Sequence, residues 1–366
     1  MLLKVTIIVV CILIFVLGGF FLLSTILRYR PSPVEDAVVI KEINSSRDIP
    51  DTLSILTWNI GYASLGKEAD FFIDGGTHSR ALSRGKVLEH LGKIIDAIKN
   101  EDPDFVLLQE VDLKARRSFY VREVAIIVQA SNNFSATFSK NYDVLWIPAP
   151  LLDMMGSVKS GILTLSQFKQ KEAKRISLPG SYRWPISIFQ LNRCIMVNRY
   201  DLKNSNKELV LINIHLSAFD KGGTIRKQQM EFLKNLIVGE YRKENYVVVG
   251  GDWNHRLTDR FNFDTTYTTD KKYLAWGLDL PKDWAPQGWK WGIDNNVPTN
   301  RSNESSFIDG KNFKTIIDGF LVSPNIKIIK VRGINLHFND SDHNPVFIKI
   351  KEASNGRRGH SEKNRK

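Results

Sequence analysis

Residues 246–257 have the sequence YVVVGGDWNHRL, in which an apolar run is followed at once by two glycines and by the polar residues Asp252 and Asn254. The apolar run predicts a buried strand. Such a strand has no structural need for the Asp and the Asn, but a single polar residue after a strand is most often a turn or capping residue. The stretch becomes informative only if other strands of the chain end in the same way.

Several other apolar runs do end in this way, and we expect each polar residue to emerge at the edge of a sheet. These residues are Asn59 in TWNI, Glu110 in LLQEV, Asn213 and His215 in INIHL, Asp318 in IIDG, and Asp342 with His343 in SDHNP. Carboxylates and carboxamides together form the hard oxygen site that Mg²⁺ or Mn²⁺ prefers. The lack of Cys–His pairs at short spacing argues against zinc. The pattern therefore predicts a divalent-metal site.

Around these motifs, the chain alternates strand-like and helix-like patterns from Leu53 onward. Residues 79–100 have the apolar spacing of an amphipathic helix, on which we expect His90 at the surface, and residues 224–241 form a second predicted helix. Because there is no internal repeat or second boundary, residues 52–352 are predicted to form one mixed α/β domain. The predicted strands are 53–60, 104–111, 157–166, 186–200, 208–216, 246–254, 315–323, 326–334 and 345–350.

The N-terminal segment differs from the rest of the chain, because the 23 residues between Lys4 and Arg28 carry no charge. A helix of this length spans about 34 Å, enough to cross a hydrocarbon core of about 30 Å. A cleaved signal peptide has a shorter apolar core and a small-residue cleavage site, which is missing here. Residues 1–30 are therefore predicted to be a retained transmembrane anchor, residues 31–51 a linker, and residues 353–366 a basic tail.

The anchor predicts a single-pass membrane protein, and we expect the catalytic domain outside the cytoplasm. The charges flanking the apolar segment are nearly balanced and do not orient it. The formal net charge of +12 favours anionic partners such as nucleic acid, phospholipid headgroups or phosphorylated metabolites. Cys11 lies in the apolar segment and Cys194 is the only other cysteine, so no disulfide can form within the domain.

The motifs WN, QEV, SGI, NIHL, GDWN, IDG and SDH, in this order from about Leu53 to Ile350, resemble the endonuclease/exonuclease/phosphatase superfamily. Deoxyribonuclease I, abasic-site endonucleases, neutral sphingomyelinases and inositol polyphosphate 5-phosphatases belong to it. The resemblance implies a four-layer α/β/β/α sandwich, in which two mainly antiparallel sheets pack face to face with helices outside. Here one transmembrane helix precedes that sandwich.

The resemblance also implies a role for each candidate site residue. Asn59, Glu110 and Asp342 are expected to hold Mg²⁺ or Mn²⁺. Asp252 is expected to orient or deprotonate the attacking water, and Asn254 to position that water or the phosphate. Asp318 is expected to hydrogen-bond His343 and to make it an imidazolium that binds phosphoryl oxygens. His215 is expected across the scissile phosphate, as an electrophile or a general acid.

Within the superfamily, His215 in NIHL favours the deoxyribonuclease I, sphingomyelinase and inositol phosphatase branches, because abasic-site endonucleases usually have a tyrosine there. GDWNHRL is similar to the GDxNxRI/L signature of inositol 5-phosphatases, but their second signature is missing and no Arg follows Asp318. Two segments are expected to build the substrate wall, residues 66–80 and the tryptophan-rich insertion 260–314. Its Trp276, Trp284, Trp289 and Trp291 could enter a bilayer interface, stack on bases or cover the core.

Three functions follow from these features. The first is a membrane-anchored, Mg²⁺-dependent phosphoesterase, expected to act as a monomer, that hydrolyses a phosphodiester of a phospholipid or sphingolipid headgroup. The second is a membrane-anchored nuclease. The third is a binding module that has lost catalysis, but the residues whose loss would indicate this are all present: Asn59, Glu110, Asp252, Asn254, Asp318 and His343.

Overall fold

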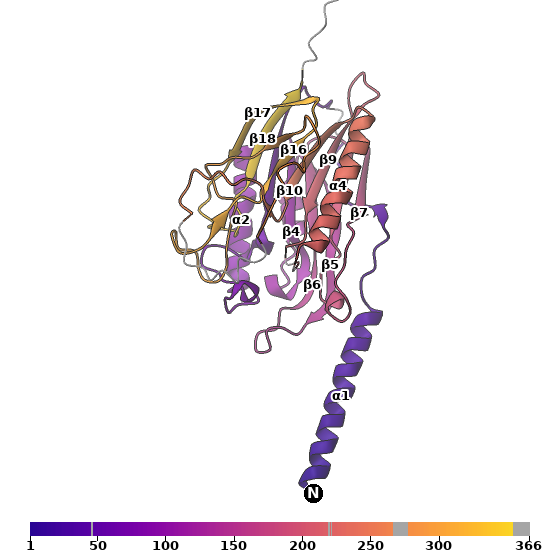
Figure 1. The fold of residues 1–366 in the computed structure, drawn as a ribbon, viewed down its shortest axis with the longest axis vertical. Coiled ribbons are helices and arrows are strands. Elements are labelled where there is room, and N and C mark those ends of the chain that lie inside the picture. The colour runs from indigo at the N-terminus through magenta and orange to yellow at the C-terminus, as the bar shows by residue number, and fades with distance from the viewer. Residues whose placement is uncertain (45–46, 219, 221, 266–276, 354–366) are drawn as a thin grey trace, which may run out of the picture.

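The computed structural model describes residues 1–44, 47–218, 220, 222–265 and 277–353. The predictions for Trp276 and for the basic tail beyond Ala353 lie outside these residues. The described part contains two large sheets that pack face to face (Figure 1). Their shared interior is apolar and includes Leu107 and Ile348 from one sheet and Leu211 and Phe320 from the other.

Each large sheet has seven strands and is mainly antiparallel. The first has the order β1–β7–β8–β9–β10–β16–β13, with β9 and β10 parallel. The second has the order β17–β18–β3–β4–β6–β5–β2, with β3 and β4 parallel. The first sheet consists of β1 (Val34–Asp36), β7 (Glu172–Ser177), β8 (Cys194–Asp201), β9 (Glu208–His215), β10 (Tyr246–Asp252), β16 (Asp318–Val322) and β13 (Lys290–Gly292). The second consists of β17 (Ile326–Gly333), β18 (Val346–Glu352), β3 (Thr52–Asn59), β4 (Phe105–Ala115), β6 (Gly156–Ser166), β5 (Ser135–Ile147) and β2 (Val38–Lys41).

Helices cover the outer faces of both sheets. Helices α2 (Arg84–Glu101) and α3 (Glu123–Ala130) pack on the second sheet, and α4 (Thr224–Arg242) packs on the first. The four-layer sandwich predicted by resemblance is confirmed. Short pairs β11 (His255–Arg256) with β12 (Leu278–Asp279), and β14 (Asn300–Arg301) with β15 (Lys314–Thr315), lie outside the two sheets.

Some element boundaries differ from those predicted. Helix α2 begins at Arg84 rather than Ser79, because the Ser83 hydroxyl accepts a hydrogen bond from the Lys86 amide and caps the helix. The predicted strand 186–200 begins only at Cys194, and residues Ile186–Ile188 form a 3₁₀ turn in the preceding loop. Strands β5 and β7 and helix α3 were not predicted.

Helix α1 (Leu2–Ile26) is 25 residues long and apolar enough to cross a membrane. It projects away from the sandwich (Figure 1), and its most apolar stretch buries no residue against the domain. Residues 31–51, predicted to be a linker, include two strands of the domain. Strand β1 pairs with β7 at the edge of the first sheet, and β2 pairs with β5 at the edge of the second. The segment after α1 is thus tied to both sheets.

The tryptophans of the insertion serve the core. Trp284 and Trp289 are buried, and Trp253 makes edge contacts with Trp284 and Trp291 at centroid separations of 5.7 and 4.7 Å. All four belong to the apolar layer between the first sheet and α4. Among the alternatives for the described tryptophans of the insertion, the structure therefore supports core packing.

Candidate active site

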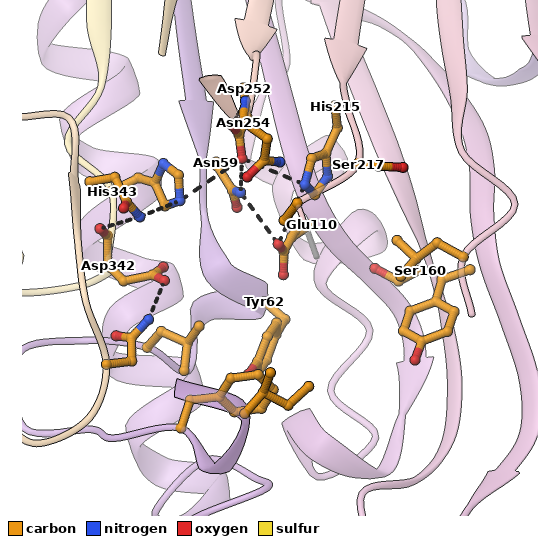
Figure 2. A pocket seen from close by; sticks show the side chains of 18 of the residues that line it. Asn59, Tyr62, Glu110, Ser160, His215, Ser217, Asp252, Asn254, Asp342 and His343 are labelled. Atoms are coloured by element: carbon orange, nitrogen blue, oxygen red, sulfur yellow. Dashed lines mark hydrogen bonds and ion pairs between the residues drawn. The ribbon is translucent and has the colours of Figure 1, made fainter. Parts of the chain in front are cut away.

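The strand ends converge on a cavity of about 330 Å³ at one end of the sandwich (Figure 2). In the first sheet, His215, Asp252 and Asp318 are in register at the adjacent ends of β9, β10 and β16. The second sheet supplies Asn59 at the end of β3 and Glu110 in β4, and Asp342 and His343 lie in the short segment that leads into β18. Seven of the eight predicted site residues line the cavity: Asn59, Glu110, His215, Asp252, Asn254, Asp342 and His343.

Asp252 lies at the centre of this group (Figure 2). Its Oδ2 accepts a hydrogen bond from Asn59 Nδ2 at 3.0 Å, and its Oδ1 accepts one from the backbone N–H of Asn254 at 2.9 Å. His215 Nε2 is 3.5 Å and His343 Nε2 is 4.0 Å from Asp252 Oδ2. Burial, together with the neighbouring Asp318 carboxylate, raises the pKa of Asp252 to about 7. Such a carboxylate can accept a proton near neutral pH.

The eighth predicted residue, Asp318, lies behind His343 and orients its ring. His343 Nδ1 is 2.8 Å from Asp318 Oδ2. Burial on its own lowers a histidine pKa, but here the Asp318 carboxylate, together with those of Asp342 and Asp252, outweighs burial and raises the pKa of His343 to about 10. The imidazole is therefore cationic at neutral pH, and both ring nitrogens carry a proton.

A protonated His343 also accounts for its neighbour Asn300. Asn300 Nδ2 lies 3.0 Å from His343 Nε2, and the buried Asn300 Oδ1 has no hydrogen-bond partner among the described residues. Two donors cannot share a hydrogen bond. If the amide rotates by half a turn, its oxygen can accept from the imidazolium, and Nδ2 then gives up its 3.5 Å hydrogen bond to the Asp342 carbonyl.

His215 has the opposite character. Burial lowers its pKa well below the usual value, and the positive charges of Arg193, His343 and Arg117 lower it further. Its Nδ1 is buried without a partner among the described residues, and its Nε2 is directed at the carboxylates of Asp252 and Glu110. His215 is thus a neutral imidazole, which favours the role of hydrogen-bond donor to a phosphoryl oxygen over that of general acid.

Glu110 lies at a bulge in β4. Its backbone φ of +55° is in the left-handed region, and the pairing of β4 with β6 shifts register between Leu108 and Val111. Non-glycine residues hold this conformation only where the surrounding structure enforces it. The bulge directs the Glu110 side chain into the cavity, where Oε1 is 3.3 Å from Asn59 Nδ2 and Oε2 is 3.9 Å from Arg117. It is the most weakly paired carboxylate of the site.

Glu110 and Asp342 fit a hard divalent cation, because both offer carboxylate oxygens to the cavity. Asp342 Oδ2 accepts a hydrogen bond from Asn303 Nδ2 at 2.8 Å, which leaves it acceptor capacity. Asn59 fits less directly, since its nitrogen faces Glu110 and Asp252 while its oxygen accepts from the Gly61 amide at 3.0 Å. Asn59 contributes an oxygen ligand only if its amide turns over.

A second grouping, Asp252, Asp318 and His343, has ligand atoms within 4.8 Å of one another and could also hold a metal ion. Of the two candidate metal sites, we prefer the one formed by Glu110 and Asp342. His343 Nδ1 is already committed to Asp318, and a protonated imidazole cannot ligate a cation.

Gly61 follows Asn59 and explains how Asp342 comes so close to the β3 end. Its φ is +50°, and a Cβ at this position would lie 2.8 Å from Asp342 Oδ1. Only glycine avoids both the strained backbone and the collision. The turn after Asn59 therefore sets the position of Asp342.

Sequence analysis missed several polar residues of the cavity. Arg193 donates to the His215 carbonyl at 3.4 Å, and Arg117 pairs with Asp112 at 2.9 Å beneath the Tyr62 ring. Asn303 bridges Asp342 and Asp74, and burial raises the pKa of Asp74 to about 7. None of these residues directly follows an apolar run, which was the signal used. Arg193 lies inside the strand predicted at 186–200. Asp74 does lie in the segment 66–80, which contributes Phe71, Ile73 and Asp74 to the cavity wall, as predicted.

Two other histidine and asparagine positions differ from expectation. His90 is buried, not at the surface, because α2 packs it against the turn after β3, with Nδ1 3.2 Å from the Ala63 carbonyl and Nε2 3.0 Å from Glu68. Asn213 does not reach the cavity. It bridges the two sheets, accepting from Gln109 at 2.8 Å and donating to the Leu163 carbonyl at 3.1 Å.

With this geometry, the fold and the site define a class of protein. The sequence profile of the Endonuclease/Exonuclease/phosphatase family matches residues 56–343, and the chain belongs to this family. Members of the family are phosphoesterases and nucleases. Among curated proteins, none matches the sequence significantly.

Solved structures share the fold at low sequence identity. The endonuclease/exonuclease/phosphatase from Beutenbergia cavernae DSM 12333 is 17% identical with a TM-score of 0.57, over 83% of this chain and 72% of that one. Truncated Caenorhabditis elegans TDP2 is 16% identical with a TM-score of 0.51, over 82% and 98% of the chains. D. rerio TDP2 complexed with a single strand DNA product is 14% identical with a TM-score of 0.51, over 82% and 100%.

Proposed function

We propose that the chain is a divalent-metal-dependent phosphodiesterase, held at a membrane by α1, that hydrolyses a phosphodiester of a lipid headgroup. The observation that carries the hydrolytic part is the buried Asp252 carboxylate. It lies within 4.0 Å of two histidines, of which His343 is cationic and His215 is neutral. A proton acceptor beside a fixed positive charge is the arrangement that hydrolysis of an anionic ester needs.

In this proposal, Asp252 orients the attacking water and accepts its proton. The side-chain Nδ2 of Asn254 donates to the Leu216 carbonyl at 2.7 Å. The side-chain oxygen of Asn254 is therefore the atom that can accept a hydrogen bond from the same water. The His343 imidazolium binds a phosphoryl oxygen through Nε2, in place of the Asn300 side chain that lies 3.0 Å from it, while Asp318 fixes its orientation from behind. The neutral His215 donates a hydrogen bond to a second phosphoryl oxygen.

Glu110 and Asp342, with Asn59 if its amide turns, would hold Mg²⁺ or Mn²⁺. When bound, the ion supplies Lewis-acid stabilisation of the charge that develops on the phosphate. Arg193, half-buried beside His215, adds a further positive charge to the pocket that receives this anion.

The membrane part of the proposal is supported by the length and composition of α1 and by its exposure outside the domain. A nuclease is the second candidate, because a solved TDP2 structure of the same fold holds a single strand DNA product and the net charge here is +12. The tether favours lipid, since it keeps the catalytic domain at high effective concentration toward headgroups.

A substrate panel with the purified full chain tests this proposal. Liposomes and plasmid DNA are supplied in parallel with Mg²⁺ at two salt concentrations, and excess chelator and Asp252→Asn serve as controls. We expect release of headgroup products that requires both Mg²⁺ and Asp252. Rapid nicking of DNA without headgroup release would decide for the nuclease.

A further inference from the structure

The foot of α1 packs against the loop formed by residues 178–193, which also forms a wall of the catalytic cavity. Phe20 stacks on Phe189 at 6.2 Å between ring centroids, and Phe21 makes an edge contact with Trp184 at the same separation. Trp184 Nε1 donates to Thr25 Oγ1 at 3.1 Å. The last turns of α1 are thus fixed to the catalytic domain.

The length of α1 sets the level of this contact in a bilayer. Its 25 residues span about 37 Å, whereas a hydrocarbon core is about 30 Å thick, so about one turn remains at the membrane surface. The last turn of α1, with Thr25 and the Trp184 side chain that touches it, therefore lies at the interface, and Phe20 and Phe21 lie about one turn deeper. Tryptophan is enriched at this level, because its ring is apolar and its N–H is polar.

Large apolar side chains are exposed on the same end of the sandwich. Leu151 is 76% exposed and Leu152 fully exposed in the β5–β6 connection, and Trp184 and Ile186 are 62% and 54% exposed in the 178–193 loop. We refer to these four residues as the apolar rim. Figure 1 shows α1 leaving the sandwich at the end where β5 and β6 are connected. One apolar cluster joins the two rim segments, since Ile147 and Met155 of the first pack in it with Phe189 of the second.

The rim is continuous with the catalytic cavity. Met155 and Leu191, which follow the two rim segments, line that cavity together with Tyr182. A second cavity of about 300 Å³, between residues 28–31 and the same loop, shares Tyr182, Gln190 and Arg193 with it. The two cavities are therefore adjacent, one beside the segment that follows α1 and one around the catalytic residues.

The basic residues beside the second cavity and in the 178–193 loop suit a phospholipid surface. Arg28 and Arg30 line the second cavity, and the exposed Arg183 lies between Tyr182 and Trp184 in the loop. Basic side chains near a membrane surface are attracted to anionic lipid, and exposed leucines gain free energy by entering the acyl boundary.

We propose that the apolar rim inserts into the same leaflet from which α1 emerges, so that the cavity mouth takes phosphodiester headgroups directly from that leaflet. The rim would fix the orientation of the domain that α1 alone only tethers. The choice of substrate rests on the proposed phosphodiesterase function, whereas insertion of the rim does not.

The test uses the full chain in vesicles of phosphatidylcholine, sphingomyelin and phosphatidylserine that contain a brominated lipid. A fluorophore is attached at Leu152→Cys in a Cys11→Ser background, and in a matched protein at Asn206→Cys, in the β8–β9 connection at the far end of β9 from His215. We expect brominated lipid to quench the label at 152 and not the label at 206. Equal, unquenched emission from both sites would overturn insertion of the rim, as would a label at 152 that responds only to added DNA.

The rate at which the protein releases headgroups from the same vesicles tests the substrate class. The double variant Leu151→Ser/Leu152→Ser is expected to release headgroups about 10-fold more slowly, while hydrolysis of soluble bis(4-nitrophenyl) phosphate stays unchanged. Ile329→Ser, which changes an exposed apolar residue of β17, is the matched control and should alter neither rate. Quenching at 152 without any headgroup release would overturn the substrate class. If neither ester is cleaved, the proposed phosphodiesterase function fails, and the quenching result still decides insertion.

Discussion

The floor and the rim of the cavity are built in opposite ways. The floor, which we define as His215, Asp252, Asp318 and His343, is buried, and each of its side chains is within 4.0 Å of another charged or titratable group. The rim is exposed and apolar. A preorganised polar floor would act on the phosphate of a soluble ester and of a membrane lipid alike. An apolar rim would favour only those phosphates that lie at a membrane surface. The comparison separates chemistry from location, and each can be removed without the other.

The largest effect is expected from the floor. Asp252→Asn removes the proposed proton acceptor without changing its shape, so kcat should fall by about 10²- to 10⁴-fold on soluble and membrane-borne esters alike. Activity assays on both substrates, with circular dichroism to confirm folding, check this. Asp201→Asn, at the opposite end of the first sheet, is the control and should keep full activity. A loss confined to vesicle substrates would contradict the separation of floor and rim.

The next effect concerns the metal. Glu110→Gln keeps the bulge but removes the charge, so the Mg²⁺ concentration for half-maximal rate should rise by about 100-fold. Titration of activity with Mg²⁺ and calorimetric measurement of Mg²⁺ binding provide two independent measurements. Glu172→Gln, at the start of β7, should change neither. Full activity of the native chain in excess chelator would show that no such metal is needed.

A smaller effect is expected within the floor on replacing Asp318 with Asn. The pKa of His343 should fall well below about 10, because the carboxylate that contributes most to raising it is gone while burial, which lowers it, remains. Histidine NMR of the detergent-solubilised chain measures this, with His343→Gln to assign the signal. An unchanged pKa would assign the charge of His343 to other carboxylates.

The sign of the linked stability follows from the same shift. A histidine whose pKa is raised in the folded state stabilises the fold fully below its unfolded pKa of about 6.5. This contribution is lost as the pH rises through about 10. The stability difference between the native chain and Asp318→Asn should therefore shrink at alkaline pH. Single and double substitutions of Asp318 and His343 should be non-additive, since both remove one interaction.

The smallest effect on stability is expected at the rim. Trp184→Ala should change the free energy of unfolding of the catalytic domain by no more than about 0.5 kcal/mol, because the ring is exposed. The buried Trp284→Ala is the matched comparison and should cost about 3–5 kcal/mol. Denaturation of both variants in detergent measures the difference. Comparable losses would mean that Trp184 belongs to the core.

The fold and most of the floor could be predicted because their signals are local. An apolar run that stops at a polar residue marks both a strand and the place where its end meets the cavity, as at Asp252. The same rule misassigned Asn213, which shares a strand face with His215 but lies two residues farther from the strand end. There the opposite sheet covers it.

The remaining features arise from partners far along the chain, which a local pattern does not contain. Asn300 is a candidate only because β14 brings it to His343, and Arg193 only because its loop folds back over β9. The tryptophan-rich insertion drew attention by composition, but among the tryptophans that the structure describes the exposed ring is that of Trp184, which lies outside the insertion. Exposure depends on which surfaces the rest of the chain leaves uncovered.

The strands that follow α1 constrain the order in which the protein can assemble during synthesis. Asp36 of β1 is paired with Lys174 of β7, 138 residues later, and β2 waits likewise for β5. The ribosome therefore delivers the membrane-side segment long before either sheet edge exists for it to join. A nascent chain that stops short of Ser177 contains α1 and β1 but lacks β7, the strand with which β1 pairs, so docking of the domain onto α1 is a late event in folding.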